Sequence, residues 1–139
     1  MPKPQLFKPP LEKEEQRAVT RLLTLAGFRV GATSQYRRSG QMVGLPDLVL
    51  LHRGLGRGGS WETKKYQRAG YHPLHRSTWI PEALSPAQVT FRADALVCNL
   101  LHGWGGLREA EDWLCALGLA TRVGNGGIMI TTPHRKTAS

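Results

Sequence analysis

Hydrophobic residues along this chain follow first a helical spacing and then a strand-like one. Residues 12–26 contain no proline or glycine. Their apolar positions recur every three or four residues, at Val19, Leu22, Leu23 and Ala26. This spacing predicts an amphipathic helix that buries one stripe, followed by a strand over residues 28–32.

Two segments around a glycine-rich turn predict a β-hairpin. The first is the mostly apolar run of residues 47–51, directly after Pro46, and the second is residues 61–66. Between them, residues 53–60 contain four glycines. Proline is tolerated at the start of a strand, so the whole segment is consistent with strand, turn and strand.

The second half of the chain adds helices and a last strand. Residues 67–83 follow neither period, whereas Ser85 and Pro86 are typical of a helix N-cap and first turn. That helix runs through Phe91, and it either continues to residue 101 or breaks near Asp94 so that residues 95–101 form a strand. Residues 107–117 predict a further helix closed by Gly118, and residues 127–132 a final strand. We therefore expect one α/β domain with a mixed sheet of four or five strands.

Charged residues in the hairpin suggest chemistry. Side chains alternate faces along a strand, so Glu62 and Lys64 point the same way and Thr63 points opposite. Pairing of the two strands can place Asp47 beside them. Two carboxylates and an ammonium suit Mg²⁺-assisted hydrolysis of a phosphodiester. The alternative is a solvated hairpin edge that carries ordinary charges.

The first helix offers two more carboxylates. Extending its apolar stripe backward from Val19 by four and seven residues reaches Glu15 and Glu12. Acidic residues in a first turn complement the helix dipole and need no further role. A glutamate directed toward the core nevertheless needs a partner, which a metal site would supply.

Four sequence blocks in this order resemble a known nuclease family. The blocks are the glutamate-bearing helix ending Ala26-Gly27-Phe28, then Gly44-Leu45-Pro46-Asp47-Leu48, Glu62-Thr63-Lys64 and Leu84-Ser85-Pro86-Ala87-Gln88. Together they resemble the VRR-NUC branch of the PD-(D/E)XK nuclease superfamily, especially its small stand-alone viral members, and more distantly the archaeal Holliday junction resolvases. Thr63 departs from the family, which usually has an apolar residue there, but threonine forms strands well.

The resemblance implies a restriction-endonuclease-like core and a set of roles. It makes Asp47 and Glu62 metal ligands, Lys64 the catalytic lysine, and Gln88 a residue that begins a helix facing the site. Glu12 stands at the family's usual distance before Gly27 and would complete the acidic cluster. Mg²⁺ would be the cofactor, with Mn²⁺ able to substitute, and no small-molecule cofactor is implied. The same resemblance favours Glu12 over Glu15 and a break of the helix near Asp94.

The charge of the chain indicates a nucleic-acid partner. Nineteen Lys and Arg against ten Asp and Glu give a formal charge of +9, which suits a phosphate backbone but would also suit other basic proteins. Basic and aromatic residues mix in residues 67–83, as either a substrate-selecting insertion or a surface loop anchored by Trp79. The candidate DNA-binding residues are Arg37, Arg38, Lys65, Arg68, Tyr71 and Arg76.

Length and composition set limits on the organisation. We expect a flexible basic arm (residues 1–10), a single nuclease domain (residues 11–133) and a basic tail (residues 134–139). The sequence has neither a membrane-length apolar run nor a signal-peptide pattern, which predicts an intracellular, cytoplasmic protein. The resemblance to viral members suggests that it is virus-encoded. Cys98 and Cys115 are expected to be buried free thiols. His72 and His75 lack the further ligands that zinc requires.

The functional expectation is a Mg²⁺-dependent DNA endonuclease. A four-way junction is the favoured substrate, because the stand-alone proteins of this resemblance are junction resolvases. Two matched cuts require two sites, which a homodimer supplies. Trp104, Leu107 and Trp113 are candidates for the dimer face, although base rates favour a core position for each of them. The alternatives are a nuclease that cuts flaps or duplex, and a basic nucleic-acid-binding protein without catalysis.

Overall fold

The computed structural model describes residues 7–33, 44–124 and 126–131. Its elements are α1 (Glu12–Leu25), β1 (Phe28–Ala32), β2 (Leu48–His52), β3 (Arg57–Thr63), the short 3₁₀ helix η1 (Arg76–Thr78), α2 (Pro86–Val97), β4 (Leu101–Gly105), α3 (Leu107–Ala116), β5 (Ala120–Val123) and β6 (Gly127–Ile130). None of the helices in these ranges is long and apolar enough to cross a membrane.

A mixed four-stranded sheet forms the centre of the molecule, in the order β1-β2-β3-β4. Strands β1, β2 and β3 are antiparallel neighbours, and β4 runs parallel to β3. The predicted hairpin is confirmed, with Leu48 opposite Trp61. Strands β5 and β6 pair separately as a two-stranded sheet. The chain thus has the mixed α/β architecture that the sequence predicts.

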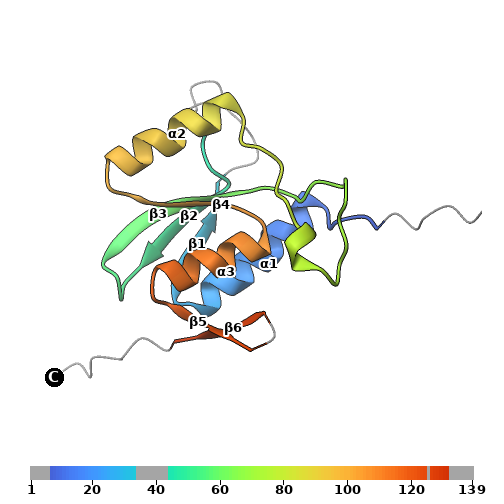
Figure 1. The fold of residues 1–139 in the computed structure, drawn as a ribbon. Coiled ribbons are helices and arrows are strands. Elements are labelled where there is room, and N and C mark those ends of the chain that lie inside the picture. The colour runs from blue at the N-terminus through green and yellow to red at the C-terminus, as the bar shows by residue number, and fades with distance from the viewer. Residues whose placement is uncertain (1–6, 34–43, 125, 132–139) are drawn as a thin grey trace, which may run out of the picture.

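Helices cover the two faces of the sheet unequally (Figure 1). Helices α1 and α3 lie on one face, where Leu48, Leu50 and Trp61 are fully buried against them. The Trp113 ring of α3 packs against Phe28 and Trp61, with ring centroids 5.6 and 5.3 Å apart. Of the helices in the described ranges, α2 is the one on the opposite face (Figure 1). The main core therefore sits under α1 and α3, and the face beneath α2 is free to hold polar residues such as Glu62.

The length of helix α2 decides whether the helix breaks near Asp94 or continues past it, which the periodicity left open. It continues to Val97, and the chain then turns at Asn99, whose φ is 61°. The expected break near Asp94 is wrong, because the amide of Cys98 still donates to the Asp94 carbonyl at 2.9 Å. The next strand, β4, follows only at Leu101.

Two strands escaped sequence prediction, β4 and β5. Strand β4 contains two glycines, which normally weaken a strand. Gly103 is required by packing, since a Cβ there would collide with the ring of Trp61. The composition of β4 therefore reflects close approach to a buried tryptophan, a constraint that local sequence does not reveal.

The cysteines and the candidate dimer residues complete this comparison. Both cysteines are free, but Cys98 is exposed and Cys115 is half-buried, so the expectation of two buried thiols is wrong for Cys98. It fails because Cys98 is the C-terminal cap residue of α2 and its side chain is exposed there. Trp104, Leu107 and Trp113 are all half-buried, and a dimer face at these residues stays a prediction.

Candidate active site

Asp47 and Glu62 lie side by side at one end of the hairpin. Leu48 pairs with Trp61, so Asp47 and Glu62 occupy the next opposed positions. The Asp47 Oδ2 accepts a hydrogen bond from the backbone amide of Thr63 at 2.9 Å. The hairpin register and this bond together hold the Asp47 carboxylate against the end of β3.

Glu62 is a buried carboxylate, with only 4% of its surface exposed. Its Oε1 accepts a hydrogen bond from Gln88 Nε2 on α2 at 2.6 Å. Its Oε2 is also buried and has no hydrogen-bond partner among the described residues. An unpartnered carboxylate oxygen inside a protein is costly, so this atom is arranged for a donor or a cation.

The two carboxylates repel each other in this setting. Burial, and next the negative charge of Asp47, raise the pKa of Glu62 to about 8, while Lys64 opposes the shift. A proton is therefore held by the pair at neutral pH. A divalent cation would replace that proton and satisfy Oε2. The oxygen donors of Asp47 and Glu62 fit Mg²⁺, which takes one or two protein carboxylates and completes its shell with water and phosphate.

Lys64 lies on the same face of the chain as Glu62. It follows β3, and its backbone amide donates to the Gly105 carbonyl at 3.0 Å, which extends the pairing with β4 by one residue. Its ammonium is close enough to lower the pKa of both Glu62 and Glu12. The three groups predicted from the hairpin thus form one electrostatic unit.

Glu12 and Glu15 separate clearly in the structure. Partial burial, and next the charge of Asp47, raise the pKa of the Glu12 carboxyl, and Lys64 lowers it. Glu15 instead is buried, and its Oε1 accepts from the Leu107 amide at 2.6 Å, at the start of α3. Glu12 therefore borders the Asp47 site, whereas Glu15 caps another helix. No three His, Cys, Asp or Glu side chains in the described ranges are grouped closely enough to hold one metal ion, so Glu12 as a third ligand stays a prediction.

We expect Glu15→Ala to destabilise the protein and Glu12→Ala to leave it stable. Removing Glu15 leaves the Leu107 amide without its acceptor, which costs about 1–3 kcal/mol of unfolding free energy. Glu12 is exposed, and its replacement should change stability by less than about 0.5 kcal/mol. Urea unfolding of the two variants measures the difference, and equal stabilities would contradict the capping role of Glu15.

Gln88 has two sets of contacts, one within the cap of helix α2 and one to Glu62. Its backbone amide donates to Ser85 Oγ at 3.2 Å, and its side-chain Oε1 accepts from the Ser85 backbone amide at 2.8 Å. These bonds form a capping box that starts α2. The remaining Nε2 group reaches Glu62. The helix cap therefore fixes the side chain that orients the buried carboxylate.

Gly44 holds the chain close to the first turn of α2. Its φ is +81°, and a Cβ on it would lie 2.5 Å from the Ala87 carbonyl oxygen. Only glycine accommodates both the left-handed backbone and this contact. Gly44 belongs to one of the four sequence blocks, but local sequence does not reveal its role, because it does not show that α2 approaches this glycine.

Gly44→Ala should therefore displace the first turn of α2 and loosen the Gln88–Glu62 bond. We expect a loss of stability of about 1–3 kcal/mol from the strained backbone, plus a further loss from the clash, and reduced cleavage. Gly56→Ala is the matched control, because Gly56 also has a positive φ, 62°, but has open space around it. Thermal unfolding measures the stability lost in each variant, and the difference between the two losses isolates the effect of the contact between Gly44 and α2. Equal losses would show that the approach to α2 is unimportant.

The remaining predicted DNA-binding residues occupy different settings. Arg37 and Arg38 lie outside the described residues. Lys65 is exposed and 3.8 Å from Glu82, and Arg68 is exposed. A role for these residues in binding DNA stays a prediction.

Tyr71 and Arg76 instead attach the insertion of residues 67–83 to the rest of the molecule. The Tyr71 side chain is buried and stacks against Trp79, with ring centroids 6.1 Å apart. Arg76 forms an ion pair with Glu111 of α3 and donates to the Gly126 carbonyl at 3.0 Å. These contacts support the anchored-loop alternative. They leave Tyr71 without an open ring face for base stacking and engage the Arg76 guanidinium within the fold.

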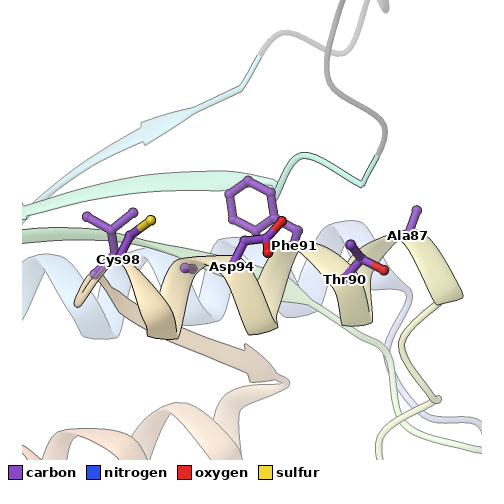
Figure 2. Close-up of a pocket in the computed structure, with 7 residues that line it drawn as sticks. Ala87, Thr90, Phe91, Asp94 and Cys98 are labelled. Atoms are coloured by element: carbon purple, nitrogen blue, oxygen red, sulfur yellow. The ribbon is translucent and has the colours of Figure 1, made fainter.

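A second surface feature is an apolar groove along α2 (Figure 2). Its volume is about 430 Å³, and the Phe91 ring, which helps to line it, lies 5.9 Å from the His102 ring. It is lined by Ala87, Thr90, Phe91, Asp94, Ala95, Cys98 and Leu100. A single carboxylate, Asp94, borders the groove. Paired-carboxylate chemistry therefore belongs to Asp47 and Glu62 and not to this groove.

No protein-family model, curated protein or solved structure matches this chain. The candidate site is therefore defined by its own geometry: a buried carboxylate pair, an adjacent lysine and a glutamine that positions one carboxylate.

Proposed function

We propose that this protein is a metal-dependent DNA endonuclease that hydrolyses phosphodiester bonds, with Asp47 and Glu62 as the metal ligands and Lys64 as the catalytic lysine. The observation that carries this proposal is the buried Glu62 Oε2, which has no partner among the described residues and lies beside the Asp47 carboxylate. Without a cation, the two carboxylates coexist at neutral pH by holding a proton, which a divalent cation would replace.

Each residue has a distinct task in this proposal. Asp47, oriented by the Thr63 amide, and Glu62, oriented by Gln88, hold the cation. When bound, Mg²⁺ supplies an acidified water and neutralises charge on the scissile phosphate. Lys64 orients the attacking water or stabilises the same charge.

The architecture supports membership of the PD-(D/E)XK group. Its motif order corresponds here to α1 with Glu12, the β2–β3 hairpin with Asp47 and Glu62, and α2 with Gln88. A mixed sheet with helices on both faces is the core that the resemblance implies (Figure 1). The VRR-NUC assignment is the more specific part of the proposal and depends on the sequence blocks.

We favour a four-way DNA junction as substrate, cut by a homodimer. The formal charge of +9 suits a partner that presents several closely spaced phosphate backbones. A C₂ dimer would place one copy of the site against each of two opposing strands, which symmetric cutting requires. The preference for junctions comes from the resemblance to stand-alone resolvases.

Substrate preference is tested with end-labelled synthetic DNA. A four-way junction, a flap and a duplex of the same sequences are incubated with the protein and Mg²⁺, and the cuts are mapped. Paired symmetric cuts in the junction alone are expected. Cutting of the flap or duplex would retain the nuclease and overturn the junction preference, whereas binding without any product would indicate a basic DNA-binding protein.

A further inference from the structure

Helix α1 separates its charges sharply along its length. All its acidic residues lie in the first turn, at Glu12, Glu14 and Glu15. Its basic residues are Lys13, Arg17 and Arg21, which are spaced by four residues and therefore share one side of the helix. This basic row is separate from the buried apolar stripe of α1, which lies on another side of the helix, so the hydrophobic pattern gives it no role.

The stability of the helix does not account for this row. Like charges four residues apart destabilise a helix by a few tenths of a kcal/mol per pair, and Lys13 lies at the unfavourable end of the helix dipole. Within residues 7–33, 44–124 and 126–131, none of the three forms an ion pair, whereas Arg76, Arg108 and Arg122 each contact a carboxylate. The row is therefore available for an anionic partner.

The surface around the row is an open groove. Its volume is about 560 Å³, and its lining is Glu12, Lys13, Gln16, Arg17, Thr20 and Arg21. Gln16 and Thr20 add hydrogen-bond donors between the basic residues. At 1.5 Å per residue, Lys13 and Arg21 are roughly 12 Å apart along the axis. A duplex whose axis lies along the helix presents about three or four phosphates of each strand over that distance.

One end of the groove lies at the candidate active site. Glu12 lines the groove and also interacts electrostatically with Asp47 and Lys64. We propose that Lys13, Arg17 and Arg21 bind successive phosphates of the DNA strand that leads into the site. This inference deepens the proposed nuclease function and depends on it. The row positions the strand, and the Asp47 site cleaves it.

The test measures how salt weakens DNA binding. Each protein–phosphate contact contributes about −0.9 to the slope of the logarithm of the association constant against the logarithm of salt concentration. The variant Arg17→Ala/Arg21→Ala should therefore reduce the magnitude of the slope by about 1.8. Fluorescence anisotropy of a labelled junction, in chelator to prevent cutting, gives the slope.

A matched control removes two arginines elsewhere. Arg53 and Arg57 are exposed at the turn of the β2–β3 hairpin, at the opposite end from Asp47 and Glu62. Arg53→Ala/Arg57→Ala should leave the slope nearly unchanged. Equal reductions in both variants would mean that only total charge matters, and no reduction in Arg17→Ala/Arg21→Ala would exclude phosphate contacts there.

A charge-preserving variant guards against misfolding. Arg17→Lys/Arg21→Lys should keep the wild-type slope, because lysine also neutralises a phosphate. A slope reduced as far as in the alanine variant would contradict a phosphate contact. Failure of the nuclease proposal looks different, since wild-type protein would then bind DNA with its full slope but yield no Mg²⁺-dependent product.

Discussion

Glu62→Gln should stabilise the cation-free protein at alkaline pH and have little effect at pH 5. The folded state raises the pKa of Glu62 from its usual 4.5 to about 8, so it binds the proton more tightly than the unfolded chain does. The stability that this proton provides is full below about pH 4.5 and is lost as pH rises through about 8. Glutamine cannot ionise, so the variant keeps this stability at alkaline pH. We expect the wild type to lose on the order of 2–4 kcal/mol of unfolding free energy there.

Urea unfolding at pH 5, 7 and 9 in chelator measures this effect. Glu14→Gln is the control, because Glu14 is an exposed residue of the first turn of α1, and its pH profile should follow the wild type. A divalent cation should then stabilise the wild type at pH 8, where it replaces the proton, and leave Glu62→Gln unaffected. A Glu62→Gln profile parallel to the wild type would contradict the buried carboxylate pair.

Asp47→Asn and Lys64→Ala should both abolish cleavage but differ in how they respond to the cation. Asp47→Asn loses a metal ligand, and Lys64→Ala loses the positive charge that stabilises the anionic transition state. Each loss should remove several kcal/mol of transition-state stabilisation, which lowers the cleavage rate by at least about 10³-fold. Asp47→Asn should also lose stabilisation by the cation, whereas Lys64→Ala should keep it. DNA binding should remain, and Asp47→Asn should bind more tightly because negative charge near the phosphate is removed.

Single-turnover cleavage and cation-dependent thermal shifts measure these two properties separately. Arg53→Ala is a control for Lys64→Ala, since Arg53 is an exposed cation at the opposite end of the same hairpin. It should cut at nearly the wild-type rate. Loss of the thermal shift in Lys64→Ala would mean that the lysine acts by holding the carboxylates in place and not on the phosphate.

Local sequence predicted the hairpin and its charged residues well, because both depend on short-range rules. The alternating pattern places Leu48 and Trp61 in the core, and this fixes the register that brings Asp47 opposite Glu62. Ser85 and Pro86 likewise predicted the start of α2, where Gln88 is positioned by a local capping box. These parts of the site needed no knowledge of distant elements.

The remaining parts depend on contacts between distant elements. Glu12 and Glu15 lie three residues apart on one helix face, and only the arrival of α3 at Glu15 distinguishes them. Tyr71 and Arg76 have the composition of a DNA-binding loop, but their partners Trp79 and Glu111 turn them into anchors. The basic row of α1 has the same origin, because only the three-dimensional structure shows that these residues form no ion pair within the described part of the chain.

Cleavage of a four-way junction that stops when Mg²⁺ is removed and resumes when it is restored tests the central claim most directly. Wild-type protein and Asp47→Asn are incubated with the labelled junction in Mg²⁺, then in excess chelator, then with Mg²⁺ restored. The carboxylate-pair site predicts product in the first and last stages with wild-type protein only. Product that forms in chelator, or equally with Asp47→Asn, would contradict a metal-dependent nuclease centred on Asp47 and Glu62.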